Sequence, residues 1–246
     1  MPNFIDKINH SKNLIKESAQ KYKNIAAACS FGKDSIVVVH LAKSVAPEIP
    51  IFYTATVFKP SETLEYAVEM NKRLNLNMKV YLVANEIPQI FKDSGVEVIL
   101  LPTREFDEAE KQSRASQKKS LFETNPDICC QLLKVEPTKE AVKNLDAWFT
   151  GLRRTEGYTR ENFQEVEKKG NLVKINPILD WTELDVWRYL AMNQLPSNPL
   201  YARGYRSLGC AVCSKIIDDS QGERDGRWQN TSKCGGECGI HTKELK

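Results

Sequence analysis

Six of the seven cysteines in this chain stand in three close pairs, and paired thiols can do chemistry. The pairs are Cys129 with Cys130, Cys210 with Cys213, and Cys234 with Cys238. The adjacent pair fits three alternatives: a strained local disulfide, half of a metal site, or two neighbours in a hydrophobic core. Each alternative predicts something different elsewhere in the chain.

Cys129, Cys130, Cys210 and Cys213 together offer four thiols to a metal. Because C-x-x-C brings two thiolates together within one turn, two such halves supply enough sulfur for zinc or an iron–sulfur cluster. Zinc sites usually separate the ligands of each half by two or more residues, so the adjacent pair favours a cluster. Zinc, and unliganded buried thiols or a redox pair, remain alternatives.

A second chemical feature is the segment CSFGKDS, which follows an apolar run and leads into an apolar helical stretch. In such a strand–loop–helix arrangement, backbone N–H groups at the helix start face an anion and a lysine adds charge. The candidate phosphate- or sulfate-binding residues are Ser30, Gly32, Lys33, Asp34 and Ser35. An ordinary turn with a surface lysine is the alternative. The segment is no Walker A motif because it lacks G-x-x-x-x-G-K-[ST].

The third feature is the segment KCGGECGIH near the end of the sequence, which places Cys238 between Glu237 and a glycine, three residues before His241. Flanking glycines suit a tail that closes over a substrate and reopens. The thiol is then either a reactive nucleophile or an inert residue of an exposed tail.

The elements that must position these residues alternate between strand and helix. Hydrophobic patterns predict strands at 25–30, 49–55, 78–84, 147–152 and 173–178, and helices at the N-terminus, 36–46, 61–74 and 182–193, with a charged helical region at 105–146. This order predicts an α/β fold with a parallel sheet and right-handed crossovers. We expect an α/β domain over 1–200 and, within the same structural unit, a C-terminal segment over 201–246 laid across the sheet.

Composition narrows the function classes. The chain has 246 residues, 41% of them hydrophobic, and a formal net charge of +3, which argues against bulk nucleic-acid binding. We see no secretory signal and no run of membrane-spanning length, and therefore expect a cytoplasmic protein without a membrane partner. An odd number of cysteines in a reducing compartment argues against a disulfide framework and favours metal or redox chemistry.

Several motifs carry a family resemblance. The segments CCQLLKVEP, WFTGLRRTEGYTR, GYRSLGCAVC and ECGIH occur in the order, and at about the spacings, found in assimilatory sulfonucleotide reductases. CSFGKDS resembles the Ser-Gly-Gly-Lys-Asp-Ser loop of the ATP pyrophosphatase superfamily, with Phe31 in place of the first glycine. The resemblance covers nearly the whole chain. It implies a parallel sheet of the adenine nucleotide alpha hydrolase-like type, with helices on both faces and a C-terminal active-site tail.

The same resemblance assigns roles to the cysteines. It implies that Cys129, Cys130, Cys210 and Cys213 ligate a [4Fe-4S] cluster, which marks the branch that typically takes adenylyl sulfate. In that family the cysteine of the tail motif attacks the sulfate sulfur, displaces AMP and leaves a thiosulfonate, and thioredoxin or a similar dithiol then releases sulfite. Cys238 is the matching residue, with Glu237 and His241 beside it. Family members are homo-oligomers, and we expect the same here.

Basic residues complete the predicted site. Sulfate transfer moves negative charge onto the departing phosphate and needs fixed cations there. The resemblance selects Lys134, Arg160, Arg224 and Arg227, with Lys33 from the loop, although any one of them taken alone is an ordinary surface charge.

The chain also departs from the family pattern. Ala55, Thr56 and Val57 replace the common Asp-Thr-Gly, so the contribution of that acid and glycine is missing or relocated. Arg206 replaces a frequent proline, a form associated with the small subunit of sulfate adenylyltransferase.

The two remaining cysteines lie outside the four predicted ligands and the nucleophile. Cys234 is an extra thiol near Cys238. We hypothesise a Cys234–Cys238 disulfide that protects the nucleophile or resolves the thiosulfonate, and unchanged oxidation and reductant dependence in Cys234→Ser would contradict it. Cys29 is predicted to be a core residue.

Reduction of adenylyl sulfate is thus the leading hypothesis, with the 3′-phosphorylated compound as the alternative substrate. A second class is an ATP pyrophosphatase-type adenylating enzyme, such as a tRNA thiolase or a sulfate adenylyltransferase subunit. It does not require the ECGIH tail. A third is a zinc-stabilised nucleotide-binding module without chemistry.

Overall fold

A computed structural model describes residues 3–218, 220–234 and 236–246. It contains one seven-stranded sheet in the order β4-β3-β2-β1-β5-β7-β6. The strands are β1 (Ile25–Ala28), β2 (Pro50–Ala55), β3 (Asn77–Val83), β4 (Glu97–Leu101), β5 (Ala147–Phe149), β6 (Val166–Lys169) and β7 (Leu172–Ile175). All neighbouring strands are parallel except β6, which pairs antiparallel with β7 at one edge. The prediction of an α/β fold with a parallel sheet is confirmed.

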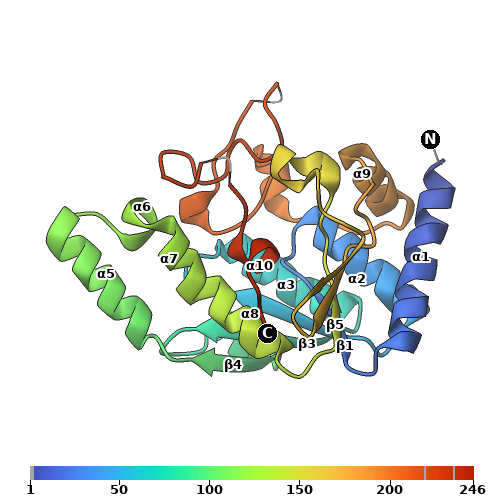
Figure 1. Ribbon diagram of the computed structural model, residues 1–246, viewed down its shortest axis with the longest axis horizontal. Helices are drawn as coiled ribbons and strands as arrows, with labels where there is room; N and C mark the ends of the chain where they lie inside the picture. The colour runs from blue at the N-terminus through green and yellow to red at the C-terminus, as the bar shows by residue number, and fades with distance from the viewer. Residues whose placement is uncertain (1–2, 219, 235) are drawn as a thin grey trace.

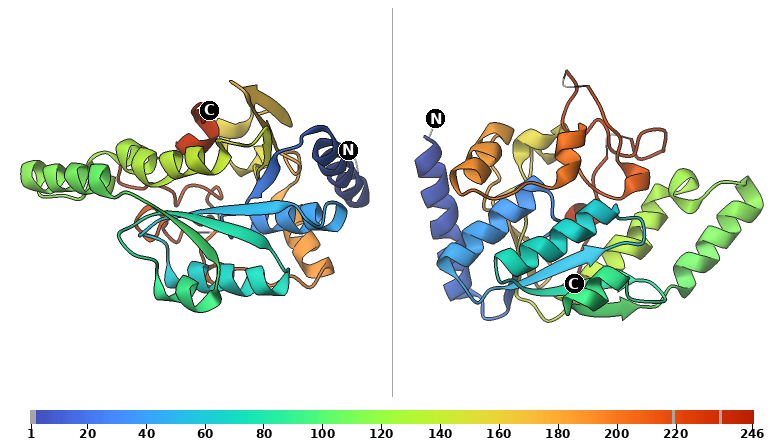
Figure 2. Two further views of the ribbon diagram at one scale, coloured as in Figure 1. Left: turned by 90° about the horizontal axis from the view of Figure 1, so that it is seen from below. Right: turned by 180° about the vertical axis from the view of Figure 1, so that it is seen from behind.

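Helices cover both faces of this sheet (Figures 1 and 2). The α-helices are α1 (Phe4–Lys21), α2 (Lys33–Val45), α3 (Ser61–Arg73), α4 (Gln89–Ser94), α5 (Arg104–Gln117), α6 (Leu121–Thr124), α7 (Pro126–Cys130), α8 (Glu136–Val142), α9 (Glu183–Met192) and α10 (Gly239–Thr242). The other helical turns are the π-helical η1 (Gln131–Val135) and the 3₁₀ turns η2 (Arg154–Glu156), η3 (Tyr158–Arg160), η4 (Pro199–Arg203) and η5 (Ala211–Cys213). No described helix is long and apolar enough to cross a membrane.

Alternating side chains divide the core between the two faces of the sheet. Ala27 and Ile51 belong to a large cluster with α1, α2, α3 and α9. Ala26, Phe52 and Trp148 point to the opposite face, where they pack with α8. Because the central strands are buried on both faces, they read in the sequence as continuous apolar runs.

Two strands were missing from the sequence prediction. β4 continues the parallel order beyond β3, and its alternating residues are mostly half-buried at the sheet edge. β6 is a charged strand that joins β7 through a tight turn in which Gly170 adopts φ +58°. Short edge strands bury little apolar surface, so their hydrophobic patterns are weak.

The segment after α9 lies over one edge of the sheet, as the orange and red chain in Figure 1 shows. It contains only short turns and α10, and its end returns to the core, where Leu245 packs near Trp148. The division into an α/β domain over 1–200 and a C-terminal segment over 201–246 stays a prediction.

Candidate active site

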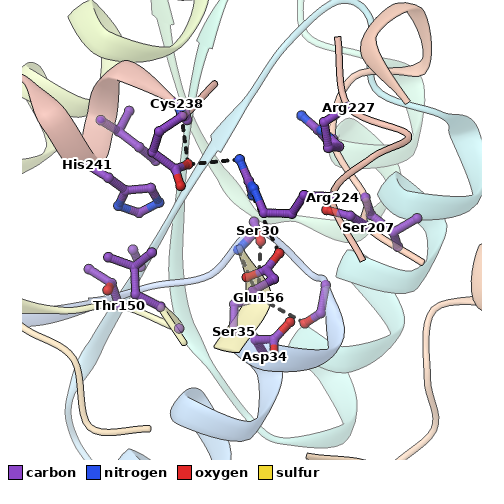
Figure 3. A pocket seen from close by; sticks show the side chains of 18 of the residues that line it. Ser30, Asp34, Ser35, Thr150, Glu156, Ser207, Arg224, Arg227, Cys238 and His241 are labelled. Carbon is purple, nitrogen blue, oxygen red and sulfur yellow. Dashed lines mark hydrogen bonds and ion pairs between the residues drawn. The ribbon is translucent and has the colours of Figure 1, made fainter. Parts of the chain in front are cut away.

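The candidate site lies where the strand order reverses, at the carboxyl ends of β1 and β5. In open parallel sheets this crevice is the usual ligand site because the flanking crossovers leave in opposite directions. A cavity of about 160 Å³ is found there. It is lined by the loop after β1, by residues 150–152 after β5, by Lys134 of η1 and by the C-terminal segment (Figure 3).

The loop after β1 forms the floor of this cavity. Gly32 precedes α2 as its N-cap, so that the helix begins at Lys33, earlier than predicted. The Ser35 hydroxyl accepts a hydrogen bond from the Ser30 backbone N–H at 3.2 Å and donates to the Gly32 carbonyl at 3.0 Å. The predicted loop residues therefore stand together at the start of α2.

Phe31 explains how the loop tolerates a residue other than glycine. Its backbone adopts φ +60°, a left-handed conformation that costs a non-glycine residue about 1–2 kcal/mol. The ring is fully buried and packs edge-on against Tyr53 and Tyr66, with ring centroids 5.0 and 6.3 Å away. Burial of an aromatic side chain offsets a cost of this size.

Gly151, after β5, lies against the start of α2. A Cβ atom at this position would approach the Ser35 backbone nitrogen to 2.8 Å. The glycine of the GLRR segment is therefore needed for close packing of β5 on the loop.

One set of cations in this pocket is neutralised by carboxylates, and we call it the acid-paired side. It consists of Lys33, Arg153, Arg160 and Arg224 with the carboxylates of Asp34, Glu156, Glu183, Glu223 and Glu237.

Lys33 is buried and its ammonium donates to Glu223 at 2.9 Å. Arg153, also buried, donates to the same carboxylate at 2.6 Å and bonds Asp34. Burial lowers the pKa of Lys33, but Asp34 and Glu223 outweigh it, so that the pKa lies above its ordinary value. Lys33 therefore stays charged, yet its charge is already paired within the protein.

Arg160 donates two hydrogen bonds to the carboxylate of Glu237 in the tail, from Nε at 2.6 Å and from Nη2 at 3.1 Å. Arg224 donates to the same carboxylate at 3.0 Å, and both arginines also contact Glu156. Burial raises the pKa of Glu237, but Arg160 and Arg224 outweigh it and hold the pKa at about 2. Figure 3 shows Arg224 between Glu156 and the tail.

The other half of the pocket, which we call the thiol side, contains the cations Lys59, Lys134 and Arg227 beside the predicted cluster cysteines. Within the described residues, none of these three cations has a carboxylate at ion-pair distance. Burial lowers the pKa of Lys134, but the thiols of Cys210, Cys238 and Cys130 outweigh it and raise the pKa. Burial, together with Lys134, lowers the pKa of Lys59 to about 8.

The four predicted cluster cysteines come from two distant parts of the chain and are all buried. Cys129 and Cys130 end α7, Cys210 precedes η5 as its N-cap, and Cys213 is the last residue of η5. Cys130, Cys210, Cys213 and the buried ring of Trp228 pack in one cluster. The fold thus brings together thiols that are far apart along the sequence.

The thiols differ in their electrostatic environment. Burial raises the pKa of Cys129 and Cys130, and it raises that of Cys213 to about 11. Burial also acts on Cys210, but Lys134, Lys59 and a Thr56 hydroxyl 3.2 Å away outweigh it, so that its pKa is lowered. Positive charge is therefore available where thiolates would form.

The described residues contain no group of three or more His, Cys, Asp or Glu side chains arranged to hold a single metal ion. Four buried thiols with cations beside them are the donor chemistry that an iron–sulfur cluster requires, so the residues present fit such a group.

Cys238 lies in the same cavity, buried at 8% exposure, as the residue before α10. Its backbone N–H donates to the Glu237 carboxylate at 2.8 Å. His241 is stacked on Trp148 of β5, with ring centroids 6.5 Å apart, and burial holds its pKa well below the ordinary value. The imidazole is therefore neutral at pH 7.

Trp228 was missed by sequence reasoning. Its ring is buried and faces Arg227, Arg224 and Lys233 at 4.6, 5.5 and 5.5 Å. Its indole Nε1, Arg227 Nε and His241 Nδ1 are buried polar atoms without a hydrogen-bond partner among the described residues. All three residues line the cavity, and unsatisfied buried polar atoms of this kind mark a place for a ligand.

Tyr201 and Lys59 were also missed. The Tyr201 hydroxyl accepts a hydrogen bond from the Lys33 backbone N–H at 2.8 Å and so ties the C-terminal segment to the loop. Lys59 follows the unusual Ala55–Val57 segment after β2. The sequence signal that could have indicated Lys59 is a lysine placed shortly after a buried strand.

The other departures have structural accounts. Arg206 pairs with Glu183 of α9 at 2.9 Å, and its carbonyl accepts from Lys33, so this residue anchors the C-terminal segment. Gly209 allows Arg227 to lie against the backbone, since a Cβ there would approach Nη1 to 2.0 Å. Cys29 is buried, as predicted, and Cys234 is exposed whereas Cys238 is buried.

The fold and the pocket define an α/β protein with a mostly parallel sheet and a thiol-lined cavity at the switch point of that sheet. Solved structures agree on the fold. The chain superposes on a phosphoadenylyl-sulfate reductase from Candida auris with a TM-score of 0.64 at 18% identity, covering 84% of this chain and 90% of that one. It superposes on an FMN adenylyltransferase from Candida glabrata with a TM-score of 0.59 at 16% identity, covering 94% of this chain and 73% of that one.

Sequence comparison identifies the family. Residues 24–98 and 87–216 match the model of the phosphoadenosine phosphosulfate reductase domain, and the chain belongs to this family. It is 33% identical to an adenosine 5'-phosphosulfate reductase from Halalkalibacterium halodurans, covering 94% of this chain and 91% of the relative. It is also 34% identical to the enzyme of the same name from Lysinibacillus sphaericus, covering 93% of this chain and 89% of that relative. The family recognised from the sequence motifs is confirmed.

Proposed function

We propose that this protein is a thiol-dependent adenylyl-sulfate reductase of sulfate assimilation, which converts adenylyl sulfate into sulfite and AMP. The observation that carries the proposal is the position of Cys238, which lines one cavity together with the anion-binding loop and the cations of both sides. The names of relatives that cover nearly the whole chain support the same activity.

In the proposed reaction the Cys238 thiolate attacks the sulfate sulfur of adenylyl sulfate. A sulfur–sulfur bond forms, and the bond from that sulfur to the bridging oxygen breaks, so that AMP leaves with the electron pair. Arg160, Arg224 and Arg227 are the cations that stabilise charge on the departing phosphate. The backbone N–H groups around Gly32 receive the nucleotide's phosphate at the start of α2.

A dithiol protein, thioredoxin or a similar reductant, completes the cycle. Its first thiolate attacks the Cys238 sulfur and releases sulfite, and its second thiol resolves the mixed disulfide, so that the reductant becomes oxidised and the Cys238 thiol is restored. This step needs access to a residue that is buried in the closed arrangement.

The tail has to move twice in each cycle. The cavity of about 160 Å³ is smaller than the roughly 300 Å³ at which pockets for ligands of nucleotide size begin. Withdrawal of 236–246 opens the loop to substrate and later exposes Cys238 to the reductant. Glu237 is its latch, because it holds the tail to Arg160 and Arg224.

Cys129, Cys130, Cys210 and Cys213 would hold the [4Fe-4S] cluster. When bound, the cluster supplies a compact anionic group that orders the charges around it. Lys134 follows the cysteine pair on η1, a π-helical turn of the kind that often marks functional sites, and the thiols of Cys210, Cys238 and Cys130 raise its pKa.

Intact-protein mass spectrometry of anaerobically purified enzyme tests the proposal. The enzyme is mixed without reductant with adenylyl sulfate and, separately, with its 3′-phosphorylated form, and Cys238→Ser is the control. We expect the gain of one SO₃ group, absent in the variant and faster with adenylyl sulfate. Faster reaction of the phosphorylated compound would make that compound the preferred substrate. If neither compound forms an adduct, the result would favour an ATP-dependent adenylating enzyme.

A further inference from the structure

Lys59 is a cation of the thiol side that the sequence motifs did not select. It follows β2 in the segment TVFKPSE, and its side chain lines the same cavity as Cys238. The side chain is half-buried, and its ammonium lies over the Tyr53 ring at 5.7 Å from the centroid. Nothing in the proposed mechanism uses it so far.

Thiols and cations are the groups that act most strongly on the charge of Lys59, and the acids Glu86 and Asp107 line a second cavity that Lys59 also borders. The charged groups that act on it are those of Lys134, Arg227, Cys210 and Cys238. The residues before it, Ala55–Val57, contribute no carboxylate. Among the residues that the structure describes, its ammonium has no carboxylate at ion-pair distance.

Lys33 shows what an internally neutralised lysine looks like in this pocket. It lines the same cavity, and three carboxylate oxygens, of Glu223, Glu183 and Asp34, lie 2.9, 3.5 and 3.7 Å from its ammonium. A cation removed from water without such partners is costly, and the cost is relieved when a bound anion supplies the opposite charge.

The position of Cys238 indicates which group of a bound sulfonucleotide lies near Lys59. For attack, the sulfate sulfur has to reach the Cys238 thiolate, and that thiol belongs to the thiol side. The acid-paired side lies around the nucleotide loop and Glu237. Lys59, on the thiol side, is therefore placed for the sulfate end of the substrate.

We propose that Lys59 is a substrate-contacting residue that binds the terminal sulfate group and holds it for attack by Cys238. This inference rests on the proposed function for its substrate. Its structural basis is the shared cavity and the absence, among the described residues, of a carboxylate at ion-pair distance from Lys59.

The test compares Lys59→Met with Lys59→Arg and with Lys72→Met, an exposed lysine on α3 that follows the same loop. Holoenzyme of each is mixed with adenylyl sulfate in a single turnover, and thiosulfonate formation is followed by mass. We expect a rate about 10–100-fold lower in Lys59→Met, partial recovery in Lys59→Arg and no change in Lys72→Met.

Binding measurements separate the sulfate end from the nucleotide. AMP lacks the sulfate group, so its affinity should stay within about 3-fold of wild type in Lys59→Met, whereas affinity for inorganic sulfate should fall about 10-fold or more. Iron content and visible absorbance should be unchanged. Wild-type rates and sulfate affinity in Lys59→Met would overturn the inference.

Two further outcomes are distinguishable. Loss of iron together with loss of AMP binding in Lys59→Met would make Lys59 a support of the cluster or the fold, which also overturns the inference. If the wild-type enzyme forms no thiosulfonate, the proposed function fails. The sulfate titration then still decides whether Lys59 binds the anion, since it requires no reaction.

Discussion

The two sides of the pocket both concentrate cations, but carboxylates neutralise the cations of only one side. On the acid-paired side each cation has at least one carboxylate partner, as in the contact of Arg160 with Glu237. On the thiol side Lys59, Lys134 and Arg227 have thiols and an aromatic ring for neighbours. Internal ion pairs fix a structure, whereas uncompensated cations remain available to a ligand.

This difference changes how the predicted substrate residues are understood. Lys33, Arg160 and Arg224 were selected as anion-binding cations, and they do line the cavity. Their charges are also used to hold Glu223 and Glu237, so they position the loop and the tail. Their contact with substrate stays a prediction. For Arg160 and Arg224 it requires that the Glu237 carboxylate of the tail moves away from them.

The largest expected effect concerns the cysteines of the thiol side. Cys210→Ser should lose the cluster and with it thiosulfonate formation, because one of four thiolate ligands is removed. Cys29→Ser is the matched control, since Cys29 is equally buried but lies in the main core. Iron content and visible absorbance are the measurement. Full iron content in Cys210→Ser would contradict the ligand assignment.

A second prediction tests whether the acid-paired side is structural. Glu223→Gln leaves Lys33 and Arg153 without their shared partner, and breaking a buried ion pair costs about 3–5 kcal/mol. Urea unfolding should show this loss of stability. Glu97→Gln, in an exposed pair with Lys79, should change stability by less than about 1 kcal/mol. Equal effects of the two changes would remove the distinction between the sides.

The third prediction concerns Lys134, the cation of the thiol side nearest in sequence to the cysteine pair. Lys134→Met should slow thiosulfonate formation about 10²–10³-fold, the usual effect of removing one group that stabilises transition-state charge. Stability should change little, because no internal carboxylate loses a partner. Lys139→Met, an exposed residue of α8 paired with Glu136, is the control. A large loss of stability with normal chemistry would place Lys134 with the acid-paired cations.

The smallest expected effect is a pH dependence from Glu237. Its pKa is about 2 in the folded protein and about 4.5 ordinarily, so the folded state binds fewer protons and the stabilisation is present above pH 4.5. It is lost as the pH falls from 4.5 toward 2, and amounts to at most about 3 kcal/mol. The difference in unfolding free energy between wild type and Glu237→Gln should shrink over this range. A constant difference would show that Glu237 is no latch.

Much of the fold could be predicted from the sequence. The apolar runs that became β1 and β2 are largely buried on both faces, and the run that became β3 alternates between buried and more exposed residues. Thr182 caps α9 as expected and accepts a hydrogen bond from the Asp185 N–H at 3.2 Å. The edge strands β4 and β6 were missed, since they bury little surface and carry weak patterns. Helix α2 begins three residues before the predicted start because Gly32, a residue without a capping side chain, is its N-cap.

The candidate site was predicted less evenly. Motifs located the loop, the four buried thiols and Cys238, because each carries a rare residue at a fixed spacing. Trp228, Tyr201 and Lys59 stand in no motif that predicted a role for them, and only the fold brings them to the cavity. The roles of all these residues in binding and chemistry remain predictions.

The sequence by itself determined the alternation of strands and helices, the family and the inventory of reactive groups, since these depend on residue types and short spacings. Tertiary structure decided which charges meet. Arg160 pairs with a carboxylate 77 residues away, and the thiol of Cys210 lies beside a threonine 154 residues away. Coulomb energy depends on distance and burial, and for groups so far apart along the chain both are set only when the sheet and the C-terminal segment come together.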